Sequence, residues 1–138
     1  MRFVLLRYDY LTQHPTIEAL DKSRPHAIVL IEVNELQFAI PLRTNLTHKH
    51  GLKTVKTGGL DYSKALLIFD ESDISRDIKL ESPEEFRAIN EREAKIVKDF
   101  TKYVNRYVTA RRKPDYNIIK REYRYSTLVN YHVYLGCD

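Results

Sequence analysis

Runs of apolar residues along the first half of the chain predict short β-strands. Residues 2–8 form one run bounded by charge, and residues 27–33 and 36–42 form two more, rich in Val, Ile, Leu and Phe. Only residues 34–35 separate the last two runs, which is the spacing of a β-hairpin. Residues 65–69 form a further short run. We therefore expect a sheet that is mostly antiparallel.

Polar stretches separate or close these strands. Residues 9–25 have a mixed composition and end in Ser-Arg-Pro, which is typical of a loop. A long polar loop follows over residues 43–64, and the acidic residues 70–73 close the next strand. Pro41 has no N–H to give to a ladder, so we expect it at the end or the edge of its strand.

A long helix is predicted over residues 83–112. Ser82 is a suitable N-cap, Pro83 suits the first helical position, and Glu85 completes a capping box. A break near Thr101 would be compatible with this length. Apolar residues recur at steps of three and four along the segment, and they are Phe86, Ile89, Ile96, Val97, Phe100, Val104, Tyr107 and Val108.

The C-terminal segment predicts a short helix. Ser126 precedes residues 127–135 as a cap, and Gly136 follows as a helix-ending glycine. The β-branched and aromatic residues in this segment leave a strand as the alternative.

Together these elements predict one α+β domain over residues 1–138, with a mostly antiparallel sheet and helices that include the long one near 83–112. The first apolar run is too short for a signal peptide, and no stretch reaches the roughly 20 apolar residues of a membrane span. The one cysteine, Cys137, cannot form an internal disulfide. We expect a cytoplasmic protein without membrane contact.

Charge is unevenly distributed along the chain. Residues 70–93 carry nine acidic and four basic side chains, whereas residues 102–124 carry eight basic and two acidic ones. Such a basic region is typical of a surface that binds a polyanion, and the alternative is a solvated helix end. The candidate RNA-binding residues are Arg106, Arg111, Arg112, Lys113, Lys120, Arg121, Arg124 and Tyr116.

Tyrosines are interleaved with this basic region. The chain has ten tyrosines and no tryptophan. Bases of single-stranded RNA stack on aromatic rings while arginine and lysine hold the phosphates. The alternative is ordinary core packing with the hydroxyl at the rim, which periodicity favours for Tyr107.

The loop between the strands holds the residue types that cleave RNA without a metal. Arginine binds phosphate with two hydrogen bonds, hydroxyls and amides orient it, histidine transfers protons near neutral pH, and lysine neutralises charge. For each residue alone, a solvated loop position is the alternative. His50 is an alternative to His48 as the residue that transfers protons. The candidate catalytic residues are Arg43, Thr44, Asn45, His48, Lys49, Ser63 and Lys64.

Metal chemistry is the competing interpretation of the loop. His48 and His50 have the spacing of a ligand pair on one strand face, but no third ligand has suitable spacing. Residues 70–73 contain three carboxylates that could bind Mg²⁺, although such a run is more often a solvated turn. The chain has no phosphate-binding glycine loop and no nucleophile elbow. We expect neither a metal nor a cofactor.

The sequence resembles the ToxN/AbiQ superfamily of type III toxin–antitoxin toxins, most closely its TenpN branch. The resemblance runs through most of the chain in order, and its strongest part is the 40–65 region. The matching segments are Arg24-Pro25-His26, Ile40-Pro41-Leu42-Arg43-Thr44-Asn45, His48-Lys49-x-Gly51, Gly59-Leu60-Asp61-Tyr62-Ser63-Lys64-Ala65 and Tyr125-Ser126-Thr127-Leu128.

This resemblance implies a compact, highly curved antiparallel sheet flanked by helices, and a metal-independent endoribonuclease that leaves a 2′,3′-cyclic phosphate. It also implies inhibition by a repeated, pseudoknotted RNA antitoxin that assembles with the toxin. The two hydroxyl-bearing positions of the family correspond to Arg43 and Thr44 in this sequence, and of these only Thr44 has a hydroxyl. The family's lysine falls on Leu46, which leaves Lys49 or Lys64 to replace it.

The leading hypothesis is therefore an endoribonuclease toxin that cleaves mRNA and takes part in phage defence. The first alternative is a non-catalytic RNA-binding module that uses the basic helix end. The second is a small regulatory or phage-defence protein that acts through protein contacts.

Overall fold

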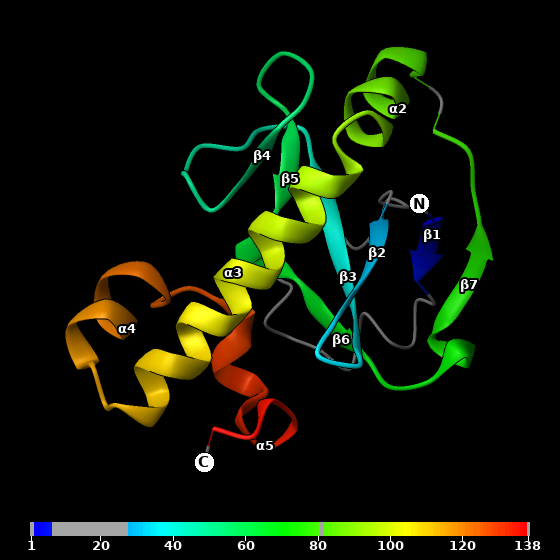
Figure 1. Ribbon diagram of the computed structural model, residues 1–138. Helices are drawn as coiled ribbons and strands as arrows, with labels where there is room; N and C mark the ends of the chain where they lie inside the picture. The colour runs from blue at the N-terminus through cyan, green and yellow to red at the C-terminus, as the bar shows by residue number, and fades with distance from the viewer. Residues whose placement is uncertain (1, 7–27, 81, 138) are drawn as a thin grey trace.

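The computed structural model describes residues 2–6, 28–80 and 82–137 (Figure 1). The predicted loop over residues 9–25 and the end of the first predicted strand lie outside the described residues. Within them, a mixed arrangement of helices and an antiparallel sheet confirms the α+β prediction.

In the described part of the chain, seven strands form one open sheet in the order β4-β5-β3-β2-β1-β7, with β6 also paired to β3. All described pairings are antiparallel. Because β2 pairs along one edge of β3, the short β5 and β6 follow one another along the opposite edge. The strands are β1 (Arg2–Leu6), β2 (Ile28–Val33), β3 (Leu36–Arg43), β4 (Gly51–Lys53), β5 (Gly59–Asp61), β6 (Leu66–Ile68) and β7 (Ile74–Asp77).

The predicted hairpin is confirmed by β2 and β3. Asn34 and Glu35 form its tip, with φ values of 53° and 66°. Positive φ at both turn residues is the geometry of a type I′ turn, whose twist matches that of the flanking strands. Asparagine tolerates this geometry, whereas for glutamate it costs about 1–2 kcal/mol.

Pro41 lies inside a central strand, so the prediction that it lies at an end or an edge was wrong. It pairs with Ile28 of β2, and it is buried. On the other edge of β3, the β6 ladder ends at Ala39 and the β5 ladder begins at Leu42. Pro41 occupies the interval between the two ladders, where a missing N–H breaks no hydrogen bond to either of these strands.

The predicted long helix is two helices, α2 (Pro83–Asn90) and α3 (Glu93–Arg112). The Ser82 hydroxyl accepts a hydrogen bond from the Glu85 N–H at 3.2 Å, which confirms the cap. The break falls before Glu93 and not near Thr101. At the break, the Arg92 guanidinium donates to the carbonyl of Lys53 in β4 at 3.1 Å.

One face of α3 covers the sheet and builds the core (Figure 1). Phe100 meets Phe38 of β3 edge-on, with ring centroids 5.3 Å apart. Tyr107 is fully buried, which confirms its expected core position. Phe86 and Val97 were expected on the same apolar face but are exposed. Phe86 lies on the separate helix α2, and Val97 lies beside the α3 face that Ile96, Phe100 and Val104 form. No helix in the described part of the chain is long and apolar enough to cross a bilayer.

The C-terminal segment is helical, which excludes the strand alternative, but it is divided into η4 (Thr127–Asn130) and α5 (His132–Leu135). Gly136 ends it with a φ of 69°, as predicted. The helix α4 (Tyr116–Glu122) was not predicted. It is seven residues long, and its apolar residues Ile118 and Ile119 are only partly buried against the core.

Replacement of Gly59 by alanine should destabilise the β4–β5 ribbon. A Cβ at Gly59 would collide with the Leu52 carbonyl and lie 2.7 Å from the Leu46 side chain. Overpacking of this kind costs about 1–3 kcal/mol. Chemical denaturation should show that loss in Gly59→Ala. The control Lys53→Ala changes an exposed side chain of the same ribbon and should unfold like the parent protein; equal stability of both variants would contradict the packing.

Candidate functional site

The predicted polar loop over residues 43–64 contains β4 and β5. Its first part, residues 44–50, folds back from the end of β3 and leads into β4. Leu46 anchors it, because its N–H donates to the Thr57 carbonyl at 2.8 Å and its side chain is buried against the ribbon. The position that the family resemblance assigns to a lysine is thus a core position here. Thr44 and Asn45 precede this anchor and are exposed.

Asp61 is a fully buried carboxylate at the end of β5, and the loop is organised around it. Its Oδ1 accepts from the Ser63 hydroxyl at 2.6 Å and from the Ser63 N–H at 3.0 Å. Its Oδ2 accepts from the Arg43 guanidinium at 3.0 Å. His48 Nε2 lies 3.2 Å from Oδ1. Four donors therefore compensate a charge that burial alone would make costly.

Both ring nitrogens of His48 have protein partners. Nδ1 accepts from the His50 backbone N–H at 3.1 Å, so the proton of the neutral ring is on Nε2. Nε2 faces Asp61 and lies 3.4 Å from the Ser63 hydroxyl. The hydroxyl points its own hydrogen at Asp61, so Ser63, His48 and Asp61 form a positioning network and not a nucleophile–base relay.

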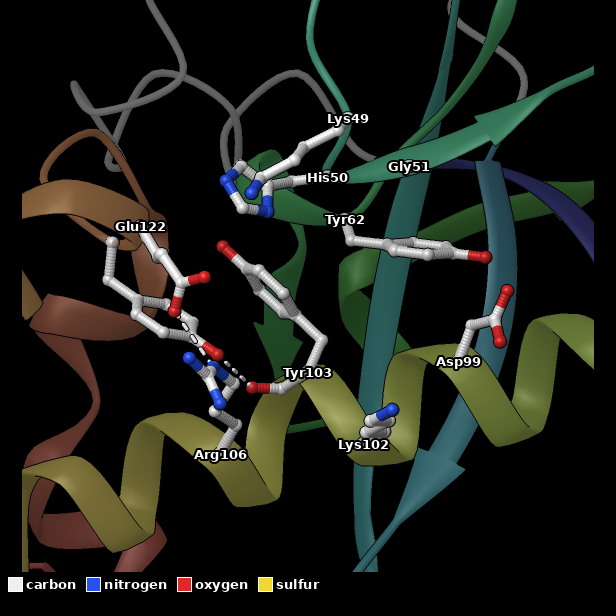
Figure 2. Close-up of a pocket in the computed structure, with 10 residues that line it drawn as sticks. Lys49, His50, Gly51, Tyr62, Asp99, Lys102, Tyr103, Arg106 and Glu122 are labelled. Carbon is white, nitrogen blue, oxygen red and sulfur yellow. Dashed lines mark hydrogen bonds and ion pairs between the residues drawn. The ribbon is translucent and has the colours of Figure 1, made fainter. Parts of the chain in front are cut away.

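The next two residues face a different space, a cavity of about 290 Å³ between the loop, α3 and α4 (Figure 2). Lys49 and His50 lie beside one another on the loop side. Tyr103 lies beneath them, and Glu122 and Arg106 are paired on the helical side. The lining residues are Lys49, His50, Gly51, Tyr62, Asp99, Lys102, Tyr103, Arg106, Glu122 and Tyr123.

His50 lines this cavity, and its pKa is lowered. Burial lowers its pKa below the ordinary 6.5, and the neighbouring His48 and Lys49 lower it further. Its ring packs on the Tyr103 ring, with centroids 5.7 Å apart, and the described residues give it no ring hydrogen bond. A neutral imidazole is therefore available at pH 7.

The other ionisable groups of the cavity are phenols, carboxylates and cations. Burial raises the pKa of Tyr103 and Tyr62, so both phenols remain protonated at neutral pH. The Arg106 hydrogen bond at 2.7 Å lowers the pKa of Glu122, which therefore stays a carboxylate. Lys49 and Lys102 are exposed cations at the edge of the same cavity.

Arg43 and Thr44 face a separate groove of about 880 Å³ between the ribbon, β7 and the start of α2. The Thr57 hydroxyl donates to the Thr44 carbonyl at 2.9 Å. The predicted catalytic set is thus divided: Lys49 reaches the cavity, His48 and Ser63 support it from behind, and Arg43 and Thr44 lie on the groove side.

Lys64 lies against the C-terminal segment. Its ammonium donates to the Tyr125 carbonyl at 2.9 Å. The nearby Thr127 hydroxyl donates to the carbonyls of Ser63, at 3.3 Å, and Ala65. Two of the segments that carry the family resemblance, 59–65 and 125–128, are therefore in direct contact.

Several of the candidate RNA-binding residues have partners within the chain. Arg106 pairs with Glu122, Arg112 donates to the Gly136 carbonyl at 3.1 Å, and Arg111 lies 3.3 Å from His132 Nδ1. Arg121 donates to a carbonyl of its own helix, and Arg124 packs on Tyr125. The remaining candidates are exposed, and they are Lys113, Lys120 and Tyr116. That this surface binds RNA stays a prediction.

The residues considered for metal binding have other roles in the structure. Asp70 and Asp73 form a reciprocal capping box around η3 (Glu71–Asp73). Within residues 2–6, 28–80 and 82–137, no three His, Cys, Asp or Glu side chains cluster as a metal site. The rings of His48 and His50 are 5.8 Å apart, and both nitrogens of His48 are engaged.

The most important residue not singled out from the sequence is Asp61. The spacing Asp-x-Ser could have indicated it, because a carboxylate that caps a turn commonly accepts from the N–H two residues on. Lys102, Tyr103 and Glu122 also line the cavity, but they come from helices far along the chain, and no local pattern links them to His50.

Comparison with known proteins gives no match to a family model, a curated protein or a solved structure. Function is therefore inferred from the residues and the geometry described above.

Asp61→Asn should destabilise the protein strongly, because it leaves Arg43 and His48 around a site without negative charge. Breaking a buried ion pair on one side costs about 3–5 kcal/mol. The control Glu32→Gln makes the same chemical change at an exposed position and should cost under about 0.5 kcal/mol. Urea unfolding measures both. Equal unfolding free energies for the two variants would show that Asp61 does not hold the loop.

Proposed function

We propose that this chain is a metal-independent endoribonuclease whose reaction centre is the cavity between the loop, α3 and α4. One observation carries the proposal. His50 has a lowered pKa and no described hydrogen bond to its ring, and it faces the same cavity as the cations Lys49 and Lys102. A base beside cations is what phosphodiester cleavage by RNA's own hydroxyl requires.

RNA carries its nucleophile, the ribose 2′-OH. His50 takes the proton of this hydroxyl while the 2′-oxygen attacks the adjacent phosphorus. The bond from phosphorus to the 5′-oxygen of the next nucleotide then breaks, and that oxygen takes up a proton. The products are a 2′,3′-cyclic phosphate and a free 5′-hydroxyl, and no water is consumed.

The cations act on the phosphate. Lys49 and Lys102 neutralise the charge that builds on its oxygens, and one of these ammonium groups supplies the proton to the leaving oxygen. Arg106 is held by Glu122, so it offers donors in a fixed position. His48 and Asp61 act through the loop: the His50 N–H that binds His48 fixes the backbone beneath the base.

The biological role proposed with this activity is that of a type III toxin in the cytoplasm. The resemblance of residues 40–65 to the ToxN/AbiQ superfamily supports it. The substrate would be mRNA, and a repeated antitoxin RNA would inhibit the enzyme within a larger toxin–RNA assembly. The basic surface of α3 and α4 offers cations to such an RNA.

His50→Gln should abolish cleavage while the protein still binds RNA. In the parent protein, kcat/KM should stay level as the pH falls to the ordinary histidine value of 6.5 and drop only below it, because the lowered pKa keeps His50 neutral. The assay uses total RNA in excess EDTA from about pH 4.5 to 8, with mapping of the cleaved ends.

The matched control is Glu35→Gln at the exposed tip of the β2–β3 hairpin, which should cleave like the parent protein. Three results contradict parts of the proposal. Full activity of His50→Gln would show that His50 is not the base, and loss of activity in EDTA would show that cleavage requires a metal. RNA binding by the parent protein without any cleavage would favour the non-catalytic module.

Lys49→Ala and Lys102→Ala should each weaken RNA binding and reduce its salt dependence. For single-stranded RNA, removal of one lysine–phosphate interaction should lower the log–log slope by about 0.7. The control Lys98→Ala removes an exposed lysine of α3 that does not line the cavity. Filter binding at several salt concentrations measures the slopes; equal slopes for all three variants would place the phosphate elsewhere.

A further inference from the structure

Tyr125 presents an aromatic ring to solvent from a fixed backbone. It is 74% exposed, although its neighbours Tyr123 and Ser126 are buried. The Ser126 N–H donates to the Tyr123 carbonyl at 3.0 Å, and the Lys64 ammonium donates to the Tyr125 carbonyl at 2.9 Å. Little conformational freedom of this backbone would be lost if the ring bound a ligand.

Two cations accompany the ring. The Arg124 guanidinium carbon lies 5.3 Å from the centroid of the Tyr125 ring. Lys64 lies at the carbonyl of the same residue. An exposed aromatic ring beside two cations provides both a stacking surface for a base and charges for its phosphates.

Two chain segments connect Tyr125 to the proposed reaction centre: its own segment, 123–126, and the segment 63–64 that binds it. Tyr123, two residues earlier, lines the cavity, and Tyr103 of the cavity donates to the Ser126 hydroxyl at 2.9 Å. Lys64 follows Ser63, which binds the Asp61 carboxylate behind His48. These contacts connect the backbone that carries Tyr125 to residues that line or support the cavity.

We propose that Tyr125, with Arg124 and Lys64, forms a stacking platform for an unpaired base next to the cleaved phosphate, which selects single-stranded over duplex RNA. The inference rests on the proposed ribonuclease function. The face of a base inside a duplex is covered by its neighbours, so only a splayed base can stack on a side chain.

Tyr134 provides the comparison. It is 54% exposed, lies on α5 beside Phe69 and does not line the cavity. Within the described residues, the cation–π contact is made by Tyr125 and not by Tyr134. Tyr134→Ala therefore removes an exposed tyrosine ring without removing the platform.

The test measures binding of a fluorescent 2′-O-methyl oligoribonucleotide of about 12 nucleotides, as a single strand and annealed to its complement. Methylation removes the nucleophile, so binding is read without cleavage. Tyr125→Ala should weaken single-strand binding roughly five- to hundredfold, whereas Tyr134→Ala should leave it unchanged. The salt dependence should be the same in both variants, since neither removes a charge. Duplex binding should be weaker than single-strand binding in the parent and should not respond to Tyr125→Ala.

Tyr125→Trp keeps a stacking ring and should bind at least as tightly as the parent, and melting curves check that each variant is folded. Binding of Tyr125→Ala at the parent's affinity would overturn the platform, as would a tryptophan variant as weak as the alanine one or an equal loss on duplex. If the RNA-cleavage assay is positive and Tyr125→Ala binds normally, only the platform fails. If Tyr125→Ala loses single-strand binding and no cleavage occurs, only the enzymatic proposal fails.

Discussion

The buried carboxylate of Asp61 is the constraint around which the polar loop is built. A carboxylate without solvent must be surrounded by donors, and the chain supplies these from β3, the loop and the turn after β5. Each donor fixes a different segment: Arg43 the end of the long strand, His48 the loop, and Ser63 the short helical turn. The Asp61 carboxylate therefore fixes the 48–50 segment together with the buried Leu46 and the hydrogen bond from the Tyr62 N–H to the His50 carbonyl at 3.0 Å.

The same constraint divides the work between the two histidines. His48 uses one nitrogen for Asp61 and the other for the backbone of His50, so it holds the loop. His50 comes next on the cavity side, where burial and two neighbouring basic groups favour its neutral form. A histidine whose two nitrogens are engaged by its neighbours is a good support but a poor base. A neutral imidazole that faces a cationic cavity is a good base but a poor support.

The sequence predicted what depends on local pattern. The β2–β3 hairpin and the cap at Ser82 follow from residues that touch their own neighbours, and the structure has both. The break before Glu93 and the place of Pro41 were not predicted. At the break Arg92 contacts Lys53, and Pro41 lies between the β6 and β5 ladders on β3; these partners are distant in sequence. The 40–65 region was indicated as a candidate site, and it supplies the loop side of the cavity, but the division of roles within it was not predictable. That division depends on the burial of Asp61 and on α3 and α4, which supply Lys102 and Glu122 to the cavity.

Compensation of charge also explains why a count of basic residues is a poor guide to this surface. Arg106 is neutralised by Glu122, and Arg112 binds a carbonyl at the end of the chain. A cation that is already paired with a carboxylate holds its remaining donors in a fixed orientation. The paired carboxylate also cancels much of the cation's long-range attraction for phosphate. Lysines such as Lys49 and Lys102 keep that attraction. In the proposed reaction, this arrangement separates two tasks at the cavity: the lysines attract the polyanion, and the paired arginine presents fixed donors beside a base that remains neutral.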